Sequence, residues 1–329
     1  MKQKILLFFF SIFFSFFLSA KDKKSQLRIG ILNGPTCIPV SFLMEEQQII
    51  GTKNVSYEKF SDPQALLPKM IKKEIEIGFM PLNVAAKVYN SGNKAIVCCA
   101  ITGLGNIKLI TTDKNVNSFL DLKGKNVYVS GQGATPEYIF RFLLNKNQLT
   151  FDTNSLSKDV IVDFSIPTAQ IVTQLISGKI KYAVVPEPFV TIAKMKSSSI
   201  YSVLDFQDEY QKITGSQNIY PLSVMVVRAD FAKNNPELVD EFISKYKSAY
   251  EKTVLTPSEA AKLSEKYDLG LSAQVVEKAI PVSNYTFIPA SKAVEISEEL
   301  LEIFLKNDSS SIGGKLPDLD FYYDSKEDR

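Results

Sequence analysis

Residues 127–138, Val-Tyr-Val-Ser-Gly-Gln-Gly-Ala-Thr-Pro-Glu-Tyr, carry the pattern best suited to binding a ligand. A short apolar strand is joined to an amphipathic helix by a loop that contains Gly131 and Gly133. These glycines let the backbone turn sharply. Thr135 is predicted as the N-cap and Pro136 as the first helical residue. The first N–H groups of such a helix lack helical partners and lie at the positive end of its dipole, so they can bind an anion or a polar ring edge. The alternative is an ordinary turn between a strand and a helix.

The composition excludes several kinds of catalytic and metal site. The chain has no histidine, which rules out a Ser-His-Asp triad, a Cys-His pair and zinc held by histidine. The spacing of Cys37, Cys98 and Cys99 does not favour a disulfide framework in a chain of this size, so we expect buried free thiols. Cys98 and Cys99 are adjacent in an apolar run and should point to opposite faces of a strand. We expect no metal and no cofactor.

Residues 1–20 have the organisation of a secretory signal peptide. A basic start is followed by an apolar run from Ile5 to Leu18 and by small residues that end at Ala20. The alternative, a retained membrane anchor, is disfavoured because a spanning helix needs about 20 apolar residues. We therefore expect cleavage near Ala20 and an exported, periplasmic product.

The charge of the mature chain is balanced. The whole chain has 38 Lys+Arg and 36 Asp+Glu, a net charge of +2. Lys2 and Lys4 leave with the signal peptide, so the mature balance is 36 − 36 = 0. Such a chain lacks the electrostatic footprint of a nucleic-acid-binding protein, and we expect no nucleic-acid partner.

Strand and helix patterns alternate through two consecutive series, which predicts an α/β fold with two mainly parallel sheets flanked by helices. A long apolar strand at 220–227 follows the second series, and the remainder from 235 is mostly helical. This order predicts two lobes joined by two crossings. Lobe 1 comprises residues 26–111 and 222–329, and lobe 2 comprises residues 112–221.

The loops that follow the predicted strands lie where ligands bind in open α/β sheets, beyond the carboxyl ends of the strands. If the lobes face each other, five loops meet in one cleft: residues 33–36, 81–83, 102–105, 130–135 and 186–188.

With these elements placed, the mature chain resembles the periplasmic solute-binding proteins of ABC importers, in the class that groups sulfonate, taurine and thiamine-pyrimidine binders. The resemblance is carried by five stretches in order: residues 28–36, 120–136, 183–189, 220–231 and 234–238. Among them are Asp-Leu-Lys-Gly-Lys and Val-Val-Pro-Glu-Pro-Phe. The resemblance implies a type II periplasmic-binding-protein fold, whose hinged lobes close on a small solute and present it to a permease.

The resemblance also implies that ligand contacts come from the cleft loops. The candidate binding residues are Asn33, Thr36, Pro81, Asn83, Gly103, Gly133, Ala134, Thr135, Glu187 and Tyr220. Glu187, between two prolines, would accept an amine or ring N–H of the solute, or else be a solvated or hinge-bridging acid. Tyr220 would stack on a ring of the solute or pack in the core.

The function implied is that of the exported, monomeric solute-binding component of an ABC importer, with an inner-membrane permease and its cytoplasmic ATPase as partners. Two alternatives stay open: an exported ligand sensor of the same fold, and a carboxylate-dependent enzyme on that fold. Arginine is scarce, which disfavours a strongly anionic solute bound by bidentate guanidinium groups. We therefore favour a vitamin-precursor-like heterocycle, neutral or zwitterionic, over a sulfonate-like anion.

Overall fold

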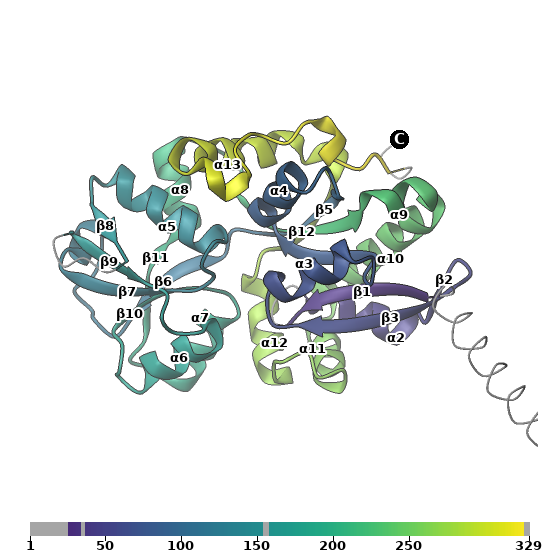
Figure 1. Ribbon diagram of the computed structural model, residues 1–329. Helices are drawn as coiled ribbons and strands as arrows, with labels where there is room; N and C mark the ends of the chain where they lie inside the picture. The colour runs from purple at the N-terminus through teal and green to yellow at the C-terminus, as the bar shows by residue number, and fades with distance from the viewer. Residues whose placement is uncertain (1–25, 34–36, 154–157, 326–329) are drawn as a thin grey trace, which may run out of the picture.

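The computed structural model describes residues 26–33, 37–153 and 158–325, which form two lobes, each a β-sheet flanked by helices (Figure 1). The predicted signal peptide and Thr36 lie outside these residues. The first sheet has the order β13-β5-β12-β4-β1-β3-β2. Its strands are β1 (Gln26–Leu32), β2 (Ile49–Ile50), β3 (Lys53–Phe60), β4 (Ile77–Pro81), β5 (Ile96–Leu104), β12 (Pro221–Arg228) and β13 (Tyr285–Pro289). Among the described residues, no helix has both the length and the apolar character needed to cross a membrane.

The second sheet has the order β11-β6-β10-β7-β9-β8. Its strands are β6 (Ile107–Thr111), β7 (Lys125–Val129), β8 (Phe151–Asp152), β9 (Val160–Asp163), β10 (Tyr182–Pro186) and β11 (Tyr201–Asp205). The chain passes from the first sheet to the second between β5 and β6 and returns between α8 (Phe206–Thr214) and β12, which confirms the two predicted crossings. Residues 107–111 pair within the second sheet, whereas the sequence boundary had placed them in lobe 1.

Both sheets contain parallel and antiparallel strand pairs. The strands β8, β9, β7 and β10 are parallel in the second sheet, as are β3, β1 and β4 in the first. The other described pairs are antiparallel, so the prediction of a mainly parallel sheet is wrong for the first lobe. The physical reason is that β12 returns from the second lobe and runs opposite to both of its neighbours, β4 and β5.

Helices cover both faces of each sheet. Those of the first lobe are α2 (Val40–Glu46), α3 (Pro63–Ile71), α4 (Leu82–Ser91), α9 (Ala229–Asn234), α10 (Pro236–Leu255), α11 (Pro257–Lys266) and α12 (Ala273–Ala279). The second lobe has α5 (Thr135–Lys146), α6 (Thr168–Ile176), α7 (Phe189–Lys196) and α8. Helix α13 (Val294–Asn307) lies across the top of both lobes in Figure 1. Short 3-10 turns are η3 (Phe119–Leu122), η4 (Ile280–Val282), η5 (Ala290–Lys292), η6 (Ser309–Ile312) and η7 (Leu319–Phe321).

The largest hydrophobic cluster runs through both lobes. It joins the side chains under α4 to those under α5 and α8, with Leu300, Leu301 and Phe304 of α13 between them. The ring of Tyr138 on α5 lies 5.5 Å from that of Phe304. Two smaller clusters lie under α2, α10 and α11 of the first lobe and under α6 and α7 of the second. The lobes therefore share a core on the side of α13 and have separate cores elsewhere.

Local signals in the sequence account for several element boundaries. Asp62 accepts a hydrogen bond from the Ala65 N–H at 2.9 Å and so caps α3, whose first residue is Pro63. Thr256 precedes Pro257 of α11 but does not cap the helix through its side chain, since its hydroxyl donates to the Lys252 carbonyl.

The three cysteines are free and buried, as predicted. Cys98 and Cys99 lie in different hydrophobic clusters on the two faces of β5, which confirms their opposite orientation. Burial raises the pKa of the Cys98 thiol to about 12, so this thiol is protonated and unreactive at neutral pH.

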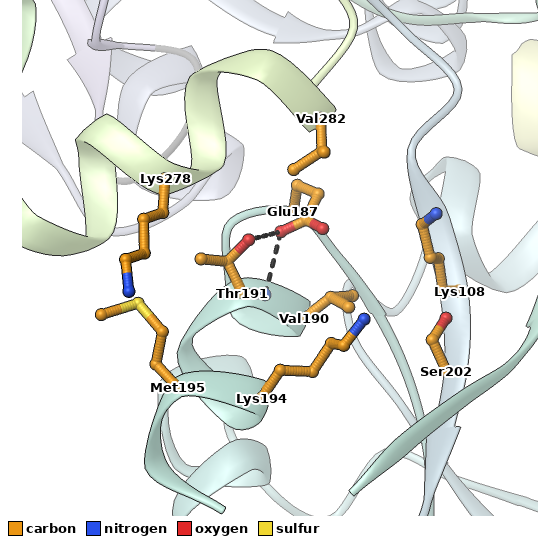
Figure 2. Close-up of a pocket in the computed structure, with 9 residues that line it drawn as sticks. All are labelled: Lys108, Glu187, Val190, Thr191, Lys194, Met195, Ser202, Lys278 and Val282. Carbon is orange, nitrogen blue, oxygen red and sulfur yellow. Dashed lines mark hydrogen bonds between the residues drawn. The ribbon is translucent and has the colours of Figure 1, made fainter. Parts of the chain in front are cut away.

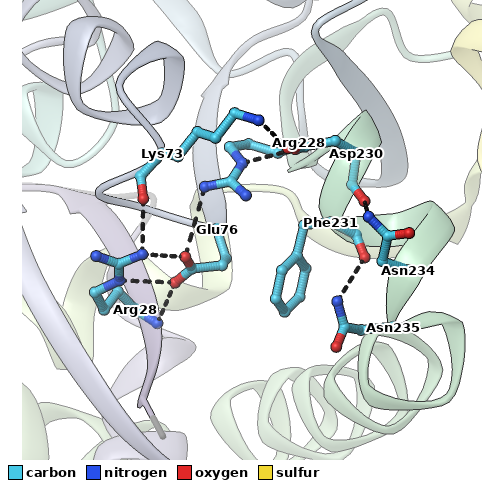
Figure 3. Close-up of polar contacts among 8 residues, drawn as sticks. All are labelled: Arg28, Lys73, Glu76, Arg228, Asp230, Phe231, Asn234 and Asn235. Carbon is cyan, nitrogen blue, oxygen red and sulfur yellow. Dashed lines mark hydrogen bonds and ion pairs between the residues drawn. The ribbon is translucent and has the colours of Figure 1, made fainter. Parts of the chain in front are cut away.

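A buried ion cluster joins three neighbouring strands at the end of the first sheet opposite Pro81 (Figure 3). The Glu76 carboxylate accepts from the backbone N–H of Arg28 at 2.8 Å and from its Nε at 3.0 Å. Arg228 of β12 approaches the same carboxylate at 3.6 Å and also pairs with Asp230 at 2.9 Å. These contacts hold β1, β4 and β12 in register, and hydrogen bonding to Glu76 raises the pKa of Arg28.

We predict that Glu76→Gln lowers the free energy of unfolding by about 3 kcal/mol, because it removes the counter-charge of the partly buried Arg28 guanidinium and leaves Arg228 with Asp230 alone. Urea unfolding of the mature protein measures the effect. The matched control, Glu74→Gln, breaks only an exposed pair with Lys69 and should cost less than about 1 kcal/mol. Equal losses in the two variants would contradict the prediction.

Candidate functional site

Asn83 at the start of α4 connects the two lobes directly. Its side chain is fully buried, and its Nδ2 donates to the Gly133 carbonyl at 3.0 Å. Its Oδ1 accepts from the Thr135 hydroxyl at 3.2 Å. Asn83, Gly133 and Thr135, three residues that the sequence assigned to the site, therefore lie together, and their polar groups bond to one another.

The glycine loop adopts the sharp turn that its sequence predicts. Gly131 and Gly133 have φ of 70° and 76°, in the left-handed region that favours glycine. The prediction of Thr135 as N-cap is wrong: helix α5 begins at Thr135, and Ala134 is its N-cap. The reason is tertiary, since the Thr135 hydroxyl bonds to Asn83 of the other lobe.

The mouth of α5 already holds a carboxylate of the chain. The Gly133 N–H donates to Glu137 Oε2 at 2.6 Å, and the Ala134 N–H donates to the Gly131 carbonyl at 3.0 Å. Glu137 is 5% exposed and forms an ion pair with Arg141 at 2.6 Å. The anion position predicted from the glycine loop is therefore filled by Glu137, and a ligand role for Gly133 and Ala134 stays a prediction.

The crossing between β5 and β6 is fixed by hydrogen bonds from the first lobe. The Gly105 N–H donates to the Tyr220 carbonyl at 2.8 Å, which joins the two crossings. Asn284 Nδ2 donates to the Gly105 carbonyl at 2.6 Å, and Asn106 Nδ2 donates to the Ser283 carbonyl at 2.7 Å. A Cβ on Gly105 would lie 2.6 Å from the Tyr220 ring, so glycine is required for the close approach.

Tyr220 packs in the core. It is 1% exposed, and its ring meets that of Tyr210 edge-on at a centroid distance of 5.3 Å. Of the two roles considered for Tyr220, the structure shows packing in the core, and stacking on a solute is not supported.

A cavity of about 520 Å³ lies between the lobes, on the side away from α13 (Figure 2). Lys278 of α12 and Val282 of η4 line it from the first lobe. The second lobe supplies Lys108, Glu187, Val190, Thr191, Lys194, Met195 and Ser202. Of the residues predicted from sequence, Glu187 lines this cavity.

Glu187 is held in place by the first turn of α7. It is 3% exposed, and its Oε2 accepts from the Thr191 N–H at 3.0 Å and from the Thr191 hydroxyl at 2.8 Å. Its own N–H donates to the Asn106 carbonyl at 3.2 Å, next to the first crossing. Burial raises the pKa of Glu187, against the opposing effect of these hydrogen bonds and of the charges of Lys108 and Lys194.

The sequence interpretation missed the lysines of the cavity. Lys108 pairs with Asp205 at 2.7 Å, whereas Lys194 and Lys278 form no ion pair within the described part of the chain. Lys194 lies on α7, whereas Glu187 precedes the N-cap of that helix, so helical spacing does not relate the two positions. No local signal indicates Lys278, because α12 reaches the cavity only through the fold. Within the described residues, no group of acidic or cysteine side chains is placed to hold a metal ion.

The other predicted residues do not line the cavity. Asn33 is exposed at the end of β1, and its N–H donates to the Phe60 carbonyl at 2.9 Å. Pro81 ends β4 and pairs in register with Ser223. Gly103 packs against the same serine, whose Oγ would lie 2.7 Å from an added Cβ.

Comparisons with known proteins agree with this architecture. A sequence model of the NMT1-like family matches residues 20–264. A crystal structure described as an ABC transporter from Parabacteroides distasonis is 22% identical and has a TM-score of 0.75, with 92% of this chain and 100% of that chain covered. No curated protein matches the sequence significantly.

Two further solved structures are periplasmic binding proteins. The aliphatic sulphonate-binding protein of Escherichia coli is 15% identical, with a TM-score of 0.69 and coverage of 92% of this chain and 93% of that chain. The nitrate-binding protein of Synechocystis is 12% identical, with a TM-score of 0.66 and coverage of 90% and 87%. These likenesses confirm the predicted type II periplasmic-binding-protein fold.

We predict that Asn83→Ala lowers the free energy of unfolding by about 1–3 kcal/mol, because it leaves the Thr135 hydroxyl and Gly133 carbonyl without their buried partner. Urea unfolding measures the loss. Asn145→Ala is the control: this exposed side chain also bonds between α5 and the end of α13, and its removal should cost less than about 0.5 kcal/mol. A loss at Asn83 no larger than at Asn145 would show that the inter-lobe bond contributes little.

The raised pKa of Glu187 gives a pH-dependent prediction. The folded protein holds this proton more tightly than the unfolded chain, so the stabilisation is present below the ordinary value of 4.5 and is lost as the pH rises through the folded pKa. Glu187→Gln keeps an acceptor oxygen for Thr191 and carries no charge. Its Tm should therefore rise relative to wild type as the pH increases above 4.5. A Tm difference independent of pH would contradict the shift.

Proposed function

The chain belongs to the NMT1-like family, and on that premise we propose that it is the exported solute-binding component of an ABC importer. The observation that carries the proposal is the cavity between the lobes, because residues of both lobes line it around a buried carboxylate, that of Glu187. A cavity of about 520 Å³ is of the size that encloses a small organic molecule.

Binding in this cavity requires contacts from both lobes. A micromolar dissociation constant corresponds to about 8 kcal/mol, whereas one hydrogen bond to a charged group contributes about 1.5–3 kcal/mol. Closure of the two lobes on the solute supplies the additional contacts. Because the Gly105–Tyr220 hydrogen bond joins the two crossings, we expect the lobes to close about this point.

The side chains of the cavity select the chemistry of the solute. Glu187 has one oxygen committed to Thr191, and its other oxygen accepts an amine or ring N–H of the solute. Val190, Met195 and Val282 supply apolar contact, and the lysines favour an anionic or strongly polar group. A vitamin-precursor-like heterocycle that bears both an N–H and a polar or anionic group meets these requirements, and so does a sulfonate-like anion with an amine.

The expected partners follow from the role. The signal peptide at residues 1–20 directs export, and the mature protein delivers its solute to an inner-membrane permease with a cytoplasmic ATPase. The periplasmic binding proteins among the similar structures support this role. An exported sensor would use the same cavity and would differ in its membrane partner.

The test is native mass spectrometry of the gently purified mature protein, followed by mass analysis of what denaturation releases. We expect one small organic molecule per chain, released unchanged. A protein that carries no small molecule and binds none in a thermal-shift screen of heterocycles and sulfonates would overturn the proposal. Chemical conversion of the bound molecule would indicate an enzyme instead.

Glu187→Gln should weaken binding of the released solute by about tenfold to a hundredfold, because it replaces a charge-assisted hydrogen bond by a neutral one. Titration calorimetry with the identified solute measures the change. Glu277→Gln, at an exposed position of α12 outside the cavity lining, is the matched control and should bind as wild type does. Unchanged affinity in Glu187→Gln would remove Glu187 from the site.

A further inference from the structure

The cavity contains more positive than negative charge. Three ammonium groups, those of Lys108, Lys194 and Lys278, surround the single lining carboxylate of Glu187. Asp205 neutralises Lys108 at 2.7 Å. Lys194 and Lys278 have no such partner among the described residues, although both line the cavity.

The two unpaired lysines come from opposite lobes. Lys194 lies on α7 of the second lobe and Lys278 on α12 of the first, and Figure 2 shows Glu187 between the helices that carry them. Helices α7 and α12 contact each other. The two lysines therefore lie on contacting helices of opposite lobes, and the repulsion between their charges opposes this contact in the empty protein.

The other anion-binding position predicted from the sequence, the glycine loop before α5, does not line the cavity and already bonds to a carboxylate. Glu137 already occupies the Gly133 N–H at the mouth of α5 and is itself paired with Arg141. An anionic group that enters between the lobes therefore meets its unneutralised charge at Lys194 and Lys278.

We propose that Lys194 and Lys278 form a divided anion site, one half on each lobe, and that an anionic group of the solute closes the lobes by bridging them. The inference rests on the proposed function, since it concerns the same cavity. It assigns the solute two separate groups: an N–H donor bound by Glu187, and a carboxylate, sulfonate or phosphate that binds both lysines. A solute that lacks the anionic group binds the second lobe and leaves the lobes open.

The first experiment changes the charges without any ligand. Small-angle X-ray scattering of the empty mature protein should give a smaller radius of gyration for Lys278→Glu than for wild type, because the introduced carboxylate would attract Lys194. Lys194→Glu should do the same from the other lobe, and the double variant should return to the wild-type value because repulsion is restored. Equal radii in all four proteins would overturn the proposal.

The second experiment uses inorganic sulfate as the probe, in place of chloride at constant ionic strength. Sulfate should raise the Tm of the wild-type mature protein and make it more compact. Lys194→Gln and Lys278→Gln should each weaken sulfate binding about tenfold or more. Lys196→Gln is the control, an exposed lysine of α7 outside the cavity lining that should leave the response unchanged. A sulfate response that persists in Lys278→Gln would overturn the divided site.

The outcomes separate this proposal from the proposed function. If the lysine variants behave as wild type while native mass spectrometry finds a stoichiometric solute, the divided anion site is contradicted and the proposed solute binding still holds. Compaction in the two single charge reversals, together with a protein that binds no organic solute, would leave anion-driven closure and remove the importer role.

Discussion

The hydrogen bond from the Gly105 N–H to the Tyr220 carbonyl, at 2.8 Å, is the constraint on which the arrangement of the lobes depends. It joins the two crossings at one point, and the Tyr220 ring fills the space that a side chain at position 105 would need. The Ser283–Asn284 turn fixes the same crossing from the first lobe. The two connections between the lobes are therefore held together at this point.

The two sides of this connection differ in their physical chemistry. On the side of α13, apolar side chains of both lobes form one continuous core, with the Asn83 contacts to the glycine loop beside it. On the side of α7 and α12, the lobes meet beside a cavity lined by charged groups. Burial of apolar surface holds the first side together, whereas the second side has charged side chains at its cavity.

Two buried carboxylates, those of Glu137 and Glu187, differ in the partners that surround them. Glu137 is paired with Arg141 and bonded to the Gly133 N–H, so its charge is satisfied within the protein. Glu187 is buried and bonds to Thr191, and burial raises its pKa. Glu137 is thus paired within the protein, whereas Glu187 forms no ion pair with any residue that the structure describes.

The sequence by itself determined the features that depend on neighbours along the chain. Asp62 before Pro63 is enough to start a helix, and Gly131 and Gly133 are enough to predict a sharp turn, because capping and backbone sterics act over a few residues. The tertiary structure alone decided which groups meet across the fold. In the folded protein the Thr135 hydroxyl bonds to Asn83 and does not cap α5. Packing of the two lobes also places Lys278 at the cavity that Glu187 lines. No local pattern contains such contacts, because hydrogen bonds and charges between distant segments depend on how the two lobes pack.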